Sequence, residues 1–264
     1  MKANAFINLK RFHLLLKRDF YTQGKSYILG LGAIFCILFI VNVASIASYK
    51  YWNFHLVFYP LTLLIGGLIF TSLSFNELSQ QQSHISYLII PASSFEKFIS
   101  KLIISSIGYV SVSLILYFLL SVFTFFFNSI IFGFAHQVFN PFHRIIWYCI
   151  RIYLVVHSIF FLGAIYFRKN SFIKTILSLF GLALTYSIFV IAILFILYFI
   201  LSFNRHIYFS LTLFNNIDKN GFNFPATLNV IFGILSYFIK TLLWYILAPF
   251  LWIITFIHLK ETEV

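Results

Sequence analysis

Side chains suited to acid–base chemistry are few in this sequence, and they avoid its long apolar segments. The six carboxylates all fall in connections or tails, and they are Asp19, Glu77, Glu96, Asp218, Glu261 and Glu263. Carriers driven by protons or sodium ions need ionisable groups buried in the membrane, and hydrolytic enzymes need paired acids. The placement of the acids argues against both classes.

The eight histidines include no pair at helical spacing with a glutamate between them, the pattern of a membrane metalloprotease. The Gly-x-x-x-x-Gly-Lys-Ser/Thr loop that cradles the phosphates of ATP is also missing from the sequence. We therefore predict that the chain is not an enzyme and has no catalytic, metal-binding or cofactor-binding residues. His157, alone on an apolar segment, is expected to form a hydrogen bond within a helical bundle.

Arg151 and Lys240 are the only charges inside the long apolar segments. Arg151 follows Trp147 and Tyr148 near one end of its segment, and Lys240 lies in an over-long segment. Each is interpreted either as a contact for an anionic substrate or lipid head group, or as a cation whose long stem reaches the membrane surface.

Composition places the chain in a membrane. Of 264 residues, 61% are hydrophobic and 9% are charged, whereas soluble domains carry about 25% charged residues. The formal net charge of +12 comes from cations that cluster at the ends of apolar segments. Contacts with lipid head groups explain this pattern, and we expect no nucleic-acid partner.

Six segments are long and apolar enough to span a bilayer as helices, which needs about 20 residues. We predict an all-α fold with one membrane domain over residues 1–264 and spans at roughly 27–48, 54–75, 102–127, 147–167, 175–203 and 230–257. With the N-terminus in the cytoplasm, twelve Lys and Arg residues lie inside and four outside. The positive-inside rule then puts both termini in the cytoplasm.

Two segments look like neither spans nor ordinary loops. Residues 5–22 repeat apolar and basic residues at helical spacing, which favours an amphipathic helix in the cytoplasmic interface; a basic flank that only fixes topology is the alternative. Residues 204–229 mix many apolar residues with Asn, Gly and Pro. That outer connection is interpreted as a re-entrant hairpin or as an interfacial loop.

The connection at residues 76–101 carries the most information. It is polar at first, turns apolar, and breaks at Pro91, after which Ser93-Ser94-Phe95-Glu96 fits a helix-capping box. An apolar stripe follows, with polar residues opposite it, so a short amphipathic helix should begin there and lead into the third span. The alternative is that this helix is only a capped extension of that span.

The run Ser86-Tyr87-Leu88-Ile89-Ile90-Pro91-Ala92-Ser93-Ser94-Phe95-Glu96-Lys97-Phe98 resembles the "yLmLPAS-x-x-EKf" signature of ABC-2-type permease subunits, particularly those of Bacteroidetes-like bacteria. The C-terminal Leu259-Lys260-Glu261-Thr262-Glu263-Val264 is similar to their short tail. The two motifs cover about twenty residues. The six-span plan, the basic N-terminal helix and an outer re-entrant hairpin fit the resemblance along the whole chain.

The resemblance implies a membrane-spanning subunit, usually of an exporter, in the bacterial inner membrane. Its partners would be a separate P-loop ATPase, which holds the ATP and Mg, together with a second copy or a paralogue and membrane lipids. The helix after Pro91 would be the coupling helix that docks on the ATPase. Its expected interface residues are Pro91, Ser93, Ser94, Phe95, Glu96, Lys97 and Phe98.

Two other functions stay open at this point. A carrier or channel that works without ATP would be favoured by buried carboxylates or by a polar stripe along a pore. A membrane enzyme is least favoured, because no reactive constellation is found in the sequence.

Overall fold

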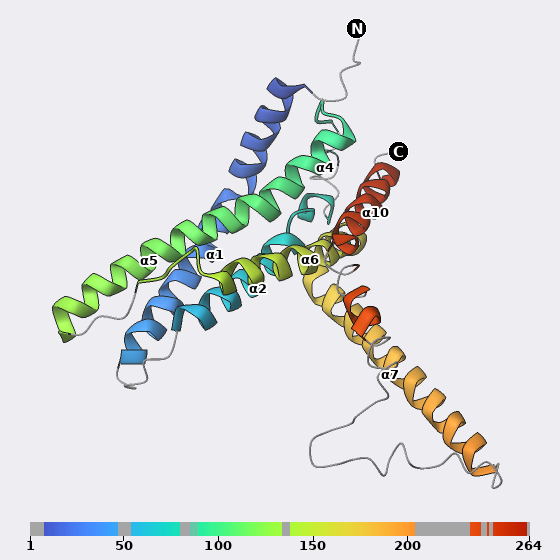
Figure 1. The fold of residues 1–264 in the computed structure, drawn as a ribbon. Helices are drawn as coiled ribbons and strands as arrows, with labels where there is room; N and C mark the ends of the chain where they lie inside the picture. Colours follow the sequence, from blue (N-terminus) through green and yellow to red (C-terminus); the bar gives the residue numbers. More distant parts are fainter. Residues whose placement is uncertain are drawn as a thin grey trace. The chain divides into compact units, whose positions relative to one another are not determined.

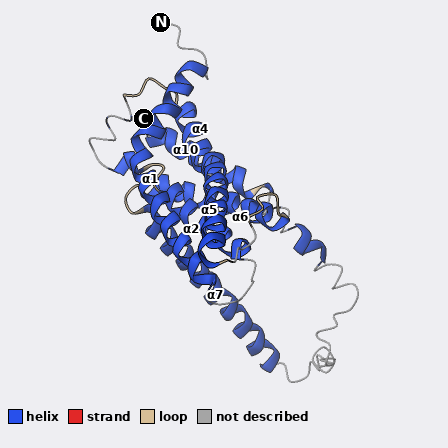
Figure 2. Cartoon of the chain, turned by 90° about the vertical axis from the view of Figure 1, so that its left-hand side faces the viewer, coloured by secondary structure: helices blue, strands red, loops and turns tan. Residues whose placement is uncertain are grey.

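The computed structural model describes residues 8–46, 54–79, 85, 87, 89–133, 138–203, 233–238, 242 and 245–262. These residues form helices and no strand (Figure 2), so the predicted all-α class is confirmed for this part of the chain. The elements (Figure 1) are α1 (Leu9–Ile46), α2 (Phe54–Ser72), the 3₁₀ turn η1 (Asn76–Ser79), α4 (Ser94–Ile103), the π-helix η2 (Ile104–Gly108), α5 (Tyr109–Phe132), α6 (Arg144–Phe167), α7 (Ser171–Phe203) and α10 (Leu247–Thr262).

Four stretches of the described residues are long and apolar enough to cross a membrane. They are His55–Leu78, Ser94–Ile131, Arg144–Phe167 and Ser171–Phe199, and they coincide with the second to fifth predicted spans. The first predicted span falls within α1 up to Ile46, and the apolar helical stretch Gly32–Val41 there is shorter than a full span. The sixth predicted span lies partly outside the described residues, and α10 overlaps the end of that span. The predicted outer connection 204–229 lies wholly outside them.

The described parts of the predicted interfacial helix, 5–22, and of the first predicted span, 27–48, form one helix. From Leu9 to Ile46, α1 runs for 38 residues with no break. No proline or helix-ending glycine conformation separates its basic first half from its apolar second half. A continuous hydrogen-bonded ladder is the result, because each residue added to an existing helix gains a bond without a new nucleation step.

The contacts divide the chain into two units. One comprises Met1–Phe172 with Leu247–Val264, and the other comprises Ile173–Ile246. In the second unit, most of the described apolar side chains of α7 are exposed in this chain. A helix that is apolar on every side is typical of a membrane span. The clusters and contacts described below belong to the first unit.

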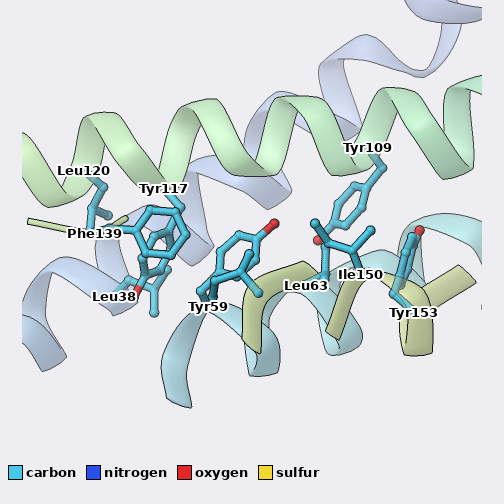
Figure 3. Packing of buried hydrophobic residues seen from close by; sticks show 10 residues of the cluster. Leu38, Tyr59, Leu63, Tyr109, Tyr117, Leu120, Phe139, Ile150 and Tyr153 are labelled. Carbon is cyan, nitrogen blue, oxygen red and sulfur yellow. The ribbon is translucent and has the colours of Figure 1, made fainter. Parts of the chain in front are cut away.

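A cluster rich in tyrosine fills the space between α2, α5 and α6 (Figure 3). The ring of Tyr59 packs against Tyr117 with centroids 5.2 Å apart, and Tyr109 packs against Tyr153 at 5.8 Å. Gly67 makes this approach possible: a Cβ there would lie 2.8 Å from Tyr109 Cε1 and would overlap the ring of Tyr153. Glycine is needed here for space.

A second cluster joins the loop after α2 to α4, α6 and α10. Its members are Phe75, Leu78, Tyr87, Phe98, Phe161, Ala164, Ile165 and Leu259, all buried. The cluster packs α4 against the C-terminal ends of α6 and α10. It thereby fixes the position of the helix that the sequence predicts after Pro91.

Candidate functional site

The capping box at the start of α4 is present as predicted. Ser93 is the N-cap, and its Oγ accepts a hydrogen bond from the Glu96 amide at 3.1 Å. In return, Glu96 Oε2 accepts from the Ser93 amide at 2.9 Å. Two amides that the helix itself leaves without partners are satisfied in this way.

Glu96 also binds the N-terminal end of α1, a contact that the sequence did not indicate. Its Oε1 accepts a hydrogen bond from the Asn8 amide at 2.7 Å and lies 3.4 Å from Arg11 Nη2. Asn8 directly precedes α1, so one carboxylate serves the N-termini of two helices. Negative charge is favourable at both positions, because a helix N-terminus carries partial positive charge.

Four charged side chains form a closed ring between α1, η1 and α4. We call Arg18, Asp19, Glu77 and Lys101 the ion-pair ring. Arg18 lies 3.3 Å from both Asp19 Oδ1 and Glu77 Oε2. Lys101 Nζ closes the ring, 3.3 Å from Asp19 Oδ1 and 3.1 Å from Glu77 Oε1. Ser100 Oγ donates a further bond to Asp19 Oδ2 at 2.8 Å.

Burial makes this ring different from an ordinary surface ion pair. The side chains of Asp19 and Lys101 are 2% and 3% exposed, and that of Arg18 is 32% exposed. Two cations and two anions alternate, so the formal charges cancel within the ring. Removing one member of such a buried set leaves its partners charged and poorly solvated, which costs far more than the loss of an exposed pair.

The polar side of α4 therefore faces the protein, contrary to what an amphipathic surface helix would show. Glu96, Lys97, Ser100 and Lys101 are all buried. Lys97 donates to the Tyr87 carbonyl at 3.1 Å and lies 4.8 Å above the Tyr87 ring. Tertiary partners on α1 and in the preceding loop reverse the expected exposure.

The apolar side of α4 is also occupied within the chain. Phe95 packs edge-on against Phe256, with centroids 5.7 Å apart. Phe98 contacts Phe161 and Phe256 at 5.8 Å and 5.5 Å. Of the predicted interface residues in this segment, Pro91 is exposed, and Ser93, Ser94 and Phe95 are half-buried.

An exposed helical turn precedes Pro91. The Ile89 amide donates to the Ile85 carbonyl at 3.1 Å, and the two isoleucine side chains are 73% and 52% exposed. Tyr87, between them in sequence, is buried with 1% exposure. The turn therefore points one residue inward and two apolar residues outward.

The other two predicted contacts are far from this cluster in sequence. Arg151 is exposed on α6, and its guanidinium lies 5.8 Å from the centroid of the Tyr148 ring. This geometry is compatible with either interpretation of Arg151. Lys240 lies outside the described residues.

His157 is hydrogen-bonded inside the bundle, as predicted. Its Nε2 lies 2.8 Å from Ser105 Oγ, and the side chain is fully buried. Among the described residues, no group of three or more His, Cys, Asp or Glu side chains is arranged to hold a metal ion.

The sequence missed Asp19 and Glu77 as members of a site. One signal was available: acids are rare in this chain, yet Asp19 and Glu77, like Glu96, stand among the lysines and arginines of the first hundred residues. This site has a mechanical role, because its buried charges join the 3₁₀ turn η1 to the helices α1 and α4.

No protein-family model, curated protein or solved structure matches this chain.

Proposed function

We propose that this chain is the membrane-spanning permease subunit of an ATP-binding-cassette exporter in the bacterial cytoplasmic membrane. It would work with a separate P-loop ATPase, which binds ATP and Mg, and with a second permease copy or a paralogue. The resemblance of the 86–98 run and the four apolar helices support this proposal. The observation that carries it is the exposed turn before Pro91, in which Ile85 and Ile89 are exposed and Tyr87 is buried in the second cluster.

The anchoring suits a part that must transmit force. The turn is followed at once by the capped start of α4, which the ion-pair ring joins to α1 and η1. A push on the turn would therefore act on α4 and, through the buried ion pairs, on α1 and η1.

The docking face is proposed to be the turn itself, with Ile85, Ile89 and Pro91 exposed. Glu96 and Phe98, which the sequence favoured as contacts, have partners within this chain. Two exposed isoleucines one helical turn apart present an apolar ridge of the kind that fits a cleft on a partner.

The test is co-purification. A tagged chain, solubilised from its native host in mild detergent, is expected to bring a P-loop ATPase with it, identified by mass spectrometry. Ile85→Ser combined with Ile89→Ser should abolish the co-purification. Leu14→Ser, which changes an equally exposed apolar residue on α1, should leave it intact.

Each contrary outcome has a different meaning. No ATPase with the intact wild-type complex would contradict the permease proposal and favour an ATP-independent carrier or channel. An ATPase that stays bound to the double variant would contradict only the docking face. Phe95→Ala with Phe98→Ala should lower the thermal stability of the chain, because both rings pack inside it.

A further inference from the structure

A π-helix joins the anchored helix α4 to the span α5 (Figure 1). Within η2 the hydrogen bonds widen by one residue, as in the bond from the Tyr109 amide to the Ile104 carbonyl. Such wide turns are uncommon and are less stable than α-helix unless something holds them, and they occur frequently at functional sites.

Two buried side chains of α6 hold this turn through one residue. Tyr153 Oη donates to the Ser105 carbonyl at 2.7 Å. Ser105 Oγ lies 2.8 Å from the Lys101 carbonyl and 2.8 Å from His157 Nε2. A carbonyl only accepts, so the hydroxyl proton points to Lys101 and the His157 Nε2–H donates to Ser105.

The wide turn sets the rotation of α4 about its axis. An α-helix advances about 100° and 1.5 Å per residue, so closing η2 into α-helix with all residues kept would turn α4 by about 100° relative to α5. Ser100 and Lys101 would then leave Asp19, and the ion-pair ring would open. The ring and the wide turn therefore belong to the same state.

We propose that η2 is a register switch, held in its wide form by Tyr153 and His157, whose closure rotates α4 and opens the ion-pair ring. What drives the switch, a push from an ATPase on the turn before Pro91, rests on the proposed function. The existence of two registers does not rest on it, because it follows from η2, its two α6 partners and the ring.

The experiment measures the accessibility of position 100. In a chain with Cys36→Ala and Cys149→Ala, Ser100→Cys reacts with a water-soluble maleimide only when α4 turns outward, since this side chain is fully buried in the wide register. Tyr153→Phe with His157→Leu should speed labelling about tenfold, the shift expected from losing two ordinary hydrogen bonds. His157→Gln, which keeps a donor near Nε2, should label like the parent.

A one-residue deletion separates a register switch from general loosening. Removing Ile107, which is 63% exposed, leaves enough residues for α-helix without turning α4. Combined with Tyr153→Phe and His157→Leu, the deletion should restore protection of Cys at position 100. Equal labelling with and without the deletion would overturn the proposal.

The fold control is Leu259→Cys, at a fully buried position in the second cluster. It should stay unlabelled in every variant, and labelling there in step with position 100 would also overturn the proposal. The measurement needs no ATPase, so its failure and a failure of the permease proposal are separate results.

Discussion

At the scale of single residues, the carboxylate of Glu96 contacts both α1 and the start of α4. Its two oxygens accept the amides of Ser93 and Asn8, and Arg11 stands 3.4 Å from one of them. Only a carboxylate offers two acceptor oxygens with a full negative charge to such a set of donors.

Glu96→Gln should therefore destabilise the protein even though it preserves the shape of the side chain. The amide nitrogen would face an N–H donor, leaving at least one buried donor without a partner, at a cost of about 1–3 kcal/mol. The measurement is thermal unfolding in detergent. Glu261→Gln, at a side chain that is 68% exposed, is the control and should unfold like the wild type; an unchanged Glu96→Gln would refute this role.

Gly67 gives a second prediction at this scale. Gly67→Ala should lower stability by about 1–3 kcal/mol, because its Cβ collides with the rings of Tyr109 and Tyr153. Gly181→Ala is the matched control, since nothing lies within 4 Å of a Cβ there. Thermal unfolding of both variants in detergent tests this prediction. Equal unfolding midpoints would show that the rings of Tyr109 and Tyr153 can move aside for the added Cβ.

At the scale of elements, the ion-pair ring binds α1 to η1 and α4. Lys101 contacts Asp19 on one element and Glu77 on another. The two acids are therefore coupled through Lys101 as well as through Arg18, and a change at Asp19 should alter the contacts of α4.

A double-mutant cycle should reveal this coupling. Asp19→Asn and Lys101→Met, separately and together, should give an interaction free energy of about 0.5–3 kcal/mol in chemical unfolding. The comparison cycle pairs Asp19→Asn with Lys174→Gln, an exposed lysine of α7, and should be additive. Additivity in the Lys101 cycle would mean that the contact between Asp19 and Lys101 adds nothing to the free energy of unfolding.

Much at this scale could be read from sequence, and the limits are physical. The start of α4 was predictable because Ser93 and Glu96 are local partners, three residues apart. The burial of Lys97 and Lys101 was not, because it depends on Tyr87 and on elements distant in sequence. The π-helix gave no signal either, since its five residues fit an apolar helix of either width.

At the scale of the whole molecule, the contacts bear on which ends share a side of the membrane. Asn8 meets Glu96, and Asp19 meets Ser100. The beginning of α1 and the beginning of α4 must then lie on one side, which the distribution of lysine and arginine predicts to be the cytoplasm.

Cysteine labelling in sealed inverted and right-side-out vesicles tests this orientation in a background free of Cys36 and Cys149. Ile85→Cys should react only from the cytoplasmic face, and Asn140→Cys, in the connection between α5 and α6, only from the outer face. Both residues are exposed. Reaction of the two positions from the same face would contradict the predicted topology.

The distance along the chain between Asp19 and its partners on α4 has a consequence for biosynthesis. Asp19 and Ser100 are separated by 81 positions, so Asp19 leaves the ribosome long before its partners on α4 exist. Arg18, the preceding residue in the chain, is the ring member closest to this carboxylate in sequence. The first half of α1 can reach its final place only after Lys101 has been translated, so this part of α1 settles no earlier than α4, although it is synthesised before it.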